Sequence, residues 1–158
     1  MNWSSLFISG ILVWIIQLTI ADLLTIDTIR PDFIGILIVY WAVKYGRFLG
    51  TLSGLIFGII FDLSGSALFF GLSPLIYTIT GYLSGNLNGM YTKINPLIYN
   101  FSWVSILLLH FFIFCTIHYQ EILIVDIDLF FGKWIGTSIY TISFMAILQF
   151  IVPLSRLD

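Results

Sequence analysis

Charged side chains in this sequence are confined to short interruptions between long apolar segments. Only 6 of its 158 residues are Lys or Arg and 8 are Asp or Glu, whereas 59% are hydrophobic. Soluble domains carry roughly 25% charged residues, so this pattern predicts an integral membrane protein. At about 20 residues per helix there is room for about six spans and none for a separate soluble domain. We therefore expect an all-α integral membrane protein in which residues 1–158 form a single polytopic membrane domain.

The two short spans in the middle of the first half raise the question of how they cross a bilayer. The six candidate spans are Leu6–Leu24, Phe33–Tyr45, Phe48–Phe61, Leu68–Leu87, Leu97–Ile117 and Leu129–Val152. The second and third would each be about 20 Å long, against a hydrocarbon core of about 30 Å. Joining them would place Lys44 and Arg47 near the middle of the membrane, at about 2.5–3.5 kcal/mol each. A short helical hairpin that turns at residues 44–47 is therefore predicted.

Helix starts are predicted by local capping signals. Ser73-Pro74 is typical of an N-cap followed by proline, with irregular chain expected before it at residues 64–71. Asn95-Pro96 indicates the start of the fifth span, and Asp126 and Asp128 precede the sixth, where a carboxylate can cap exposed backbone N–H groups. The first apolar segment is interpreted as a retained helix, because it lacks the basic start and the cleavage site of a signal peptide.

The distribution of basic residues predicts the orientation. With six spans and an internal N-terminus, four cations fall on the cytoplasmic side and two on the outer side. The cytoplasmic set is Lys44, Arg47, Lys93 and Arg156, and the outer set is Arg30 and Lys133. We expect a multi-pass protein of the bacterial inner (cytoplasmic) membrane with both termini in the cytoplasm.

Glycines recur at every fourth position of the third span, at Gly46, Gly50, Gly54 and Gly58. In membrane helices such spacing lets two backbones approach closely. Packing within the chain is the favoured interpretation, and a dimer seam or a partner helix is the alternative. The same spacing at Gly81 and Gly85 predicts that the third and fourth spans are neighbours.

Asp62 lies four residues beyond the last of these glycines. It is expected either to be hydrated at the membrane surface or to turn inward and pair with a cation or a backbone N–H. Arg30 is the nearest cation on that side. The alternatives are a pairing of Arg30 with Asp32 or Asp62 and simple exposure.

Few residues of the sequence indicate a catalytic or a metal-binding site. His110 and His118 are about 12 Å apart along a helix, too far to share one metal ion, and His110 is expected to bond to a neighbouring helix instead. Asp22 and Asp62 lack the signature of intramembrane aspartic proteases. No nucleophile, phosphate or dinucleotide motif occurs, so we expect no enzyme activity, no cofactor and no metal. The net charge of -2 argues against nucleic acid, and Cys115 is expected to be a packing residue.

The stretch "RPDFIGILIVYWAVKYG" followed by "GTLSGLIFGIIFDLSGS" resembles the MreD family of the bacterial rod-shape system, or elongasome. The resemblance covers residues 30–85 best. It implies a non-enzymatic scaffold of cell-shape maintenance and peptidoglycan synthesis that binds MreC, and through it MreB, RodA and the elongation transpeptidase. It also implies a six-helix fold resembling the S components of ECF vitamin transporters. The positions that carry it, as candidates for partner binding or structure, are Arg30, Pro31, Asp32, Tyr40, Trp41, Gly50, Gly54, Gly58 and Asp62.

A physical mechanism for such a scaffold follows from the short second and third spans. Flanked by longer helices, they would leave a depression that a single-span partner helix could fill. The alternative function is a substrate-binding S component of an ECF-type vitamin transporter, which predicts a polar cavity near the outer face. A channel would need a polar stripe through two long helices, and only Lys133, Thr137 and Thr141 offer one.

Overall fold

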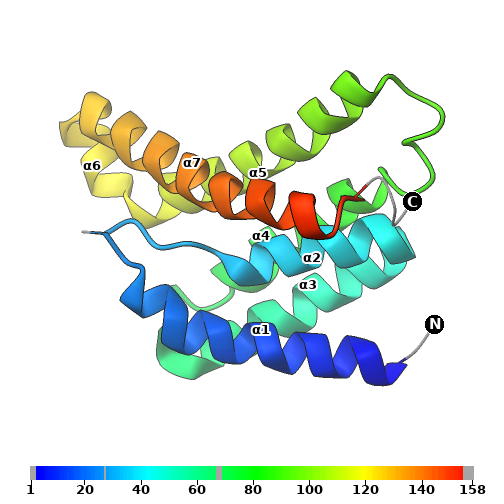
Figure 1. Ribbon diagram of the computed structural model, residues 1–158. Coiled ribbons are helices and arrows are strands. Elements are labelled where there is room, and N and C mark those ends of the chain that lie inside the picture. The colour runs from blue at the N-terminus through cyan, green and yellow to red at the C-terminus, as the bar shows by residue number, and fades with distance from the viewer. Residues whose placement is uncertain (1–2, 27, 67–68, 155–158) are drawn as a thin grey trace.

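The structure is a computed structural model, and it describes residues 3–26, 28–66 and 69–154. Its helices run back and forth, from left to right and right to left in Figure 1, and form one bundle. In chain order they are α1 Trp3–Leu23, α2 Phe33–Tyr45, α3 Arg47–Phe61, the π-helix η1 Asp62–Ser66, α4 Leu72–Gly85, α5 Pro96–His118, α6 Gln120–Val125 and α7 Ile127–Ile151. The helical architecture expected from the apolar segments is confirmed.

The ends of the helices gather at two ends of the bundle (Figure 1). The end of α1, the start of α2, η1, the start of α4 and the end of α5 lie together on the left, and we call this the Asp32 end. The α2–α3 turn, the end of α4 and the start of α5 lie at the opposite end. Segments far apart in the sequence are therefore brought together at the Asp32 end.

Length and composition make four helical segments suitable for crossing a membrane. They are Leu6–Leu23, Arg47–Ser64, Pro96–His118 and Ile127–Ile151, and Phe33–Tyr45 is a shorter apolar helix. Four long segments are fewer than the six spans expected from hydropathy, because α2 and α4 are only 13 and 14 residues long. An α-helix of that length covers about 20 Å, less than the hydrocarbon core.

The turn between α2 and α3 falls where it was predicted. Gly46 links the two helices with φ of 84°, a conformation that residues with a side chain rarely adopt. The starts of α5 and α7 are also confirmed, because Asn95 and Asp126 accept hydrogen bonds from Leu97 N and Leu129 N.

The start of α4 differs from the prediction at Ser73-Pro74. The helix begins at Leu72, after Gly71 in the left-handed conformation. Of the stretch expected to be irregular, residues 64–66 are helical, and residues 67–68 lie outside the described part. The short helix α6 was not predicted.

The glycine series packs α3 directly against α4. A methyl group added at Gly54 would overlap the backbone carbonyl of Tyr77, and one added at Gly58 would overlap the backbone of Pro74. Gly50 and Gly81 face each other in the same way, so the interpretation as packing within the chain is confirmed. Close backbone contact is the source of attraction here, because lipid offers no hydrophobic gain for association.

Helix α2 lies in the interior of the bundle. Seven of its 13 residues are buried: Ile34, Gly35, Ile36, Ile38, Val39, Ala42 and Val43. Its remaining surface includes one partly exposed stripe, Phe33, Leu37, Tyr40 and Trp41, which we call the α2 stripe. The expectation that the short second and third spans together border a depression for a partner helix is therefore wrong for most of α2, because α1, α3, α4 and α7 cover it.

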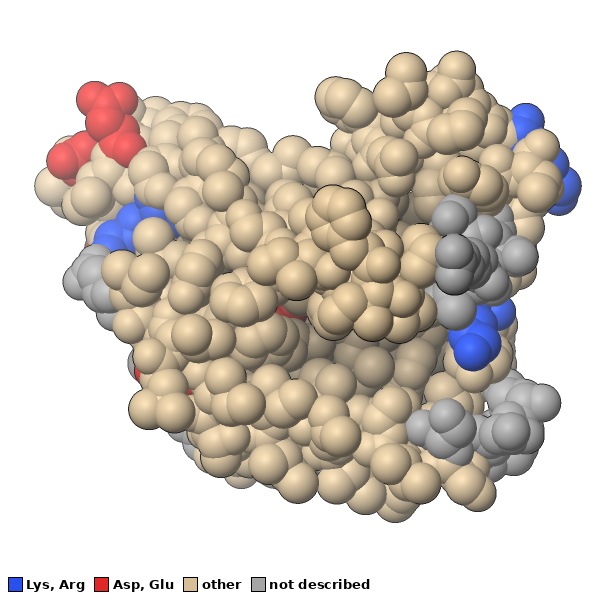
Figure 2. All heavy atoms as spheres, in the orientation of Figure 1, with Lys and Arg blue, Asp and Glu red and all other residues tan. Residues whose placement is uncertain are grey.

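The α2 stripe lies between two long helices. Phe33 packs on Phe144 of α7 with ring centroids 5.3 Å apart, and the Tyr40 hydroxyl donates to the Val152 carbonyl just after α7. On the other side, Trp41 packs on Phe57 and lies against Gly10 of α1. Figure 2 shows a hollow on this face of the molecule, between α1 below and α7 above. A short central helix flanked by longer ones thus leaves a depression in the surface.

We expect Gly54→Ala to destabilise the protein by about 1–3 kcal/mol, because its Cβ would force α3 and α4 apart. Thermal unfolding of the purified chain in detergent measures this. The matched control is Gly132→Ala in α7, where a Cβ meets nothing within 4 Å and helix propensity improves. Equal unfolding temperatures for the two variants would contradict this account of the α3–α4 contact.

Candidate functional site

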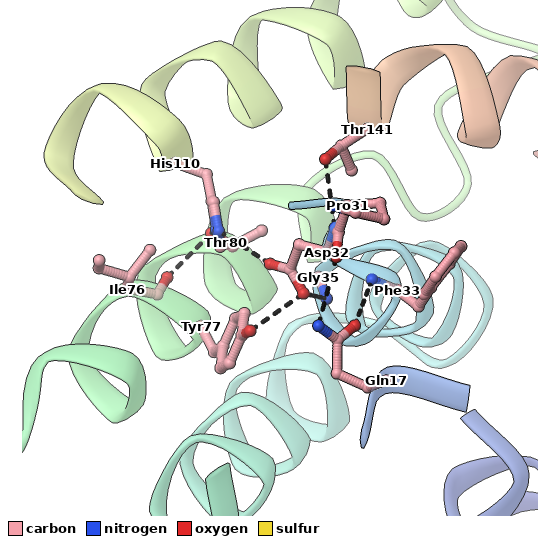
Figure 3. Close-up of polar contacts among 10 residues, drawn as sticks. All are labelled: Gln17, Pro31, Asp32, Phe33, Gly35, Ile76, Tyr77, Thr80, His110 and Thr141. Atoms are coloured by element: carbon pink, nitrogen blue, oxygen red, sulfur yellow. Dashed lines mark hydrogen bonds and ion pairs between the residues drawn. The ribbon is translucent and has the colours of Figure 1, made fainter. Parts of the chain in front are cut away.

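Asp32 is the centre of a polar network inside the apolar bundle (Figure 3). It caps the N-terminus of α2, and its Oδ1 accepts hydrogen bonds from Gly35 N at 2.8 Å and from the Tyr77 hydroxyl at 3.0 Å. Gly35 is suited to this place, since a Cβ there would lie 2.6 Å from Asp32 Oδ2. The carboxyl group is thereby held over the first turn of α2, where the helix dipole favours negative charge.

His110 of α5 meets the other oxygen of this carboxyl group. Its Nε2 lies 3.1 Å from Asp32 Oδ2, and its side chain is only 4% exposed. The second ring nitrogen, Nδ1, lies 2.8 Å from the hydroxyl oxygen of Thr80 in α4. The expectation that His110 bonds to a neighbouring helix is confirmed, and the bonds reach α4 and the start of α2.

Gln17 and Thr141 tie the segment around Asp32 to α1 and α7. The Gln17 amide donates to the Pro31 carbonyl at 3.3 Å and accepts from Phe33 N at 2.7 Å. The backbone N–H of Asp32 donates to Thr141 Oγ1 at 3.2 Å. These bonds satisfy backbone groups that lipid could not, in a segment of chain that precedes a helix.

Arg30 pairs with Asp22, which is neither of the two aspartates considered from the sequence. Its guanidinium lies 3.0 Å from Asp22 and donates to the Gln17 carbonyl at 2.8 Å, so the alternative of a pairing with Asp32 or Asp62 is wrong. Asp32 and Asp62 have other partners, since His110 meets Asp32 Oδ2 and Gly71 N donates to Asp62 Oδ2. Asp22 is 62% exposed, and such ion pairs add at most about 1 kcal/mol.

Asp62 takes the inward-facing alternative predicted for it. It is buried, and its Oδ2 accepts a hydrogen bond from Gly71 N. The bond joins the start of η1 to the residue that precedes α4. Asp62 therefore holds the two ends of the connection between α3 and α4 together.

A cavity of about 210 Å³ adjoins this network at the Asp32 end. Its polar lining includes Gln17, Arg30, Asp32, Tyr77, His110 and His118, and its apolar lining includes Phe61, Phe69, Phe111 and Phe114. Phe69 is 42% exposed, so the lining reaches the surface of the molecule. The network thus borders a space connected to the exterior of the bundle.

The structure divides the residues singled out from the sequence into three groups and one separate residue, Asp62. Arg30, Pro31 and Asp32 belong to the network, and Gly50, Gly54 and Gly58 form the α3–α4 contact. Tyr40 and Trp41 lie on the α2 stripe, and Asp62 lies at the start of η1.

Several members of the network were not among those candidates: Gln17, Gly35, Tyr77, Thr80, His110 and Thr141. Four of them, Gln17, Thr80, His110 and Thr141, share one sequence signal, which is a polar side chain inside an apolar helix. Polar residues there usually face other helices rather than lipid. The signal indicates burial, but it does not say which residues meet.

Comparison with known proteins identifies the family. A family model described as rod shape-determining protein MreD matches residues 1–154. The chain belongs to the MreD family. No curated protein and no solved structure matches the chain, so the fold likeness to transporter S components receives no support from these comparisons. The match agrees with the resemblance carried by residues 30–85 and extends it over nearly the whole chain.

Membership of the MreD family implies a role in rod shape determination. It also agrees with a multi-pass membrane protein, for which the structure offers four long apolar helical segments. Within this MreD protein, the Asp32 network joins the start of α2 to α1, α4, α5 and α7.

We expect Asp32→Ala to destabilise this MreD protein by roughly 3–5 kcal/mol, because it leaves the Tyr77 hydroxyl, Gly35 N and His110 without their shared acceptor. Asp32→Asn retains the Oδ1 acceptor but places an amide N–H group against His110 Nε2, so a smaller loss of about 1–3 kcal/mol is expected. Thermal unfolding in detergent distinguishes the two. Asp128→Ala, an exposed acidic residue in the first turn of α7, is the control, and an equal effect there would refute the central place of Asp32.

Proposed function

We propose that this protein is a non-enzymatic membrane scaffold of the elongasome, which supports peptidoglycan synthesis by binding MreC and, through it, MreB, RodA and the elongation transpeptidase. Family membership supports the role in rod shape. The observation that carries the scaffold mechanism is the hollow between α1 and α7 (Figure 2). We assign it to the single membrane helix of MreC.

The α2 stripe supports this assignment by its position and chemistry. At 100° per residue, Leu37 lies between Tyr40 and Trp41 on the surface of α2. The stripe is partly exposed in a helix that is otherwise buried, and it is composed of apolar and aromatic side chains. Aromatic side chains dominate the energetics of many protein interfaces, because they bury a large rigid area.

The flanking helices have unused apolar surface. On α1, Phe7 is 74% exposed and Ile11 is 48% exposed, and on α7 Ile147 is 59% exposed. Lipid covers such residues as well as protein does, so burial alone would not hold a partner there. A partner helix in the hollow would gain from close packing against both walls and against the α2 stripe.

In this proposal the glycines and the Asp32 network have structural roles, and Tyr40 and Trp41 have the partner-binding role. The glycines are occupied by the α3–α4 contact, so they offer no free surface on that side. Arg30 and Asp22 lie at the Asp32 end, where the portion of MreC outside the membrane would be positioned.

The proposed orientation places the Asp32 end outside and both termini in the cytoplasm. Lys44, Arg47 and Lys93 all lie at the opposite end, beside the α2–α3 turn and the start of α5. In the space-filling view, Lys and Arg are visible at both ends, whereas Asp and Glu gather at the Asp32 end (Figure 2). An excess of basic residues favours the cytoplasmic side. Arg156, which also supports this orientation, lies outside the described residues.

The alternative function, an S component of an ECF-type vitamin transporter, is favoured by one observation, the partly polar cavity at the Asp32 end. Its volume of about 210 Å³ is below the roughly 300–1,000 Å³ of pockets for organic ligands. Several of its polar lining residues also already have partners within the protein. Tyr77 donates to Asp32, and Gln17 bonds to the backbone of Pro31 and Phe33. The scaffold is therefore the better supported function.

We expect Leu37→Trp to reduce copurification with MreC several-fold, because the larger side chain would fill the floor of the hollow. The measurement is affinity purification of the full chain in mild detergent from cells that contain both proteins. Membrane insertion should be unchanged, since Leu37 is partly exposed.

The matched control is Ile98→Trp, which places the same side chain at a 58% exposed position of α5, away from the α2 stripe. It should copurify with MreC like the unmodified protein. Undiminished copurification of Leu37→Trp would reject the hollow as the MreC site. A vitamin retained by the purified protein would instead support the S-component alternative.

A further inference from the structure

The Thr80 hydroxyl has two acceptors within reach and one hydrogen to donate. Its oxygen lies 2.8 Å from the Ile76 carbonyl oxygen in the preceding turn of α4 and 2.8 Å from His110 Nδ1 (Figure 3). If the hydrogen points to Nδ1, that nitrogen is an acceptor. If it points to the Ile76 carbonyl, the hydroxyl oxygen is free to accept a hydrogen bond from Nδ1.

These two hydroxyl orientations match two protonation states of His110. In the first, neutral His110 carries hydrogen on Nε2 and donates it to Asp32 Oδ2, while Nδ1 accepts from Thr80. In the second, a proton has been added to Nδ1, which donates to Thr80, and Thr80 donates to Ile76. Both nitrogens of His110, the Asp32 Oδ2 that it meets and the Thr80 hydroxyl have a partner in both states. The two states differ by the rotation of the Thr80 hydroxyl, and no heavier atom has to move.

The added proton changes the charge buried at the Asp32 end. With neutral His110, the pair has a charge of -1, and the Asp32 carboxylate is held by Gly35 N, Tyr77 and His110. With His110 protonated, the pair is neutral overall. Burial of a net charge is costly in an apolar surrounding, whereas three hydrogen bonds and the α2 N-terminus stabilise the lone carboxylate. Opposing terms of this kind allow both states to exist.

The other charged and titratable groups around the pair come from every neighbouring element. Arg30, before α2, and Asp62, in η1, both act electrostatically on Tyr77 of α4, which touches Asp32. They carry opposite charges. His118 of α5 lines the same cavity, Asp22 of α1 pairs with Arg30, and Lys133 of α7 contacts Thr28 at the cavity lining.

The cavity connects the pair with the surface of the molecule. Asp32 and His110 both line it, together with the exposed residues Thr28 and Phe69. We propose that Asp32, His110 and Thr80 form a reversible binding site for one proton, taken up from the Asp32 end, with the Thr80 hydroxyl rotating to accommodate it. Histidine is the side chain suited to proton exchange in the physiological range. The site links proton binding to the contact between α2, α4 and α5.

The test uses the full chain in detergent, labelled with ¹⁵N-histidine. His118→Gln serves as the parent, because the chain has two histidines and this change leaves His110 alone. Nitrogen spectra are recorded between about pH 5 and 8, where histidine exchanges its proton. We expect Nε2 to be protonated throughout and Nδ1 to change from hydrogen-bond acceptor to donor as the pH falls. A ring that keeps one protonation state throughout would overturn the proposal.

Three further variants test the role of Thr80. Thr80→Val removes the hydroxyl at nearly constant shape, so an about tenfold higher proton concentration should be needed to protonate Nδ1, since a charged donor loses more than a neutral acceptor does. Thr80→Ser retains the hydroxyl and should titrate like the parent. Thr116→Val in α5 makes the same chemical change outside the network, at a hydroxyl that donates to the Phe112 carbonyl, and should also resemble the parent.

Two outcomes would overturn the assignment to Thr80. One is a Thr80→Val variant that titrates together with Thr116→Val, and the other is a Thr80→Ser variant that titrates unlike the parent. Should Thr80→Val fail to fold, the change of Nδ1 from acceptor to donor in the parent, or its absence, still decides whether the site binds a proton. Copurification with MreC plays no part in these readouts, so their result is independent of the scaffold function.

Discussion

The structure depends on holding one carboxyl group, that of Asp32, inside an apolar bundle. A buried carboxylate without partners is far less stable than one in water, so its neighbours must supply hydrogen bonds. Here they come from Gly35 N, Tyr77 and His110, which belong to three helices. The polar requirement of one side chain thereby sets where α2, α4 and α5 meet. In a membrane, where apolar contact between helices has no advantage over lipid, such bonds are a principal means of choosing neighbours.

Close backbone packing is the second means, and it acts on the other side of α4. Gly54 and Gly58 bring α3 against Tyr77 and Pro74, on the same helix that presents Tyr77 and Thr80 to Asp32 and His110. Helix α4 is thus fixed by glycine contacts on one face and by hydrogen bonds on another. A short helix can be held in the bundle in this way even though its length covers only part of the hydrocarbon core.

The two proposed activities use different parts of this architecture. The partner surface is the hollow over the α2 stripe, between α1 and α7 (Figure 2). The proton site lies at the start of α2, beside the cavity at the Asp32 end. Both include α2, and Phe33 of the stripe directly follows Asp32 in the chain. A change of charge at Asp32 and His110 would therefore take place at the start of the helix that forms the floor of the partner surface.

The sequence by itself determined the membrane character, the turn at Gly46, the capped starts of α5 and α7, and the α3–α4 contact, because hydropathy, caps and four-residue glycine spacing are local properties. The stretch "RPDFIGILIVYWAVKYG" followed by "GTLSGLIFGIIFDLSGS" also indicated the family that the match over residues 1–154 shows. Only the tertiary structure decided that Asp32 meets His110 and that Arg30 meets Asp22. These partners are 78 and 8 positions apart, and nothing local distinguishes one acidic residue from another as a partner. The tertiary structure also decided that other helices enclose α2, since an apolar helix has the same composition whether lipid or protein surrounds it.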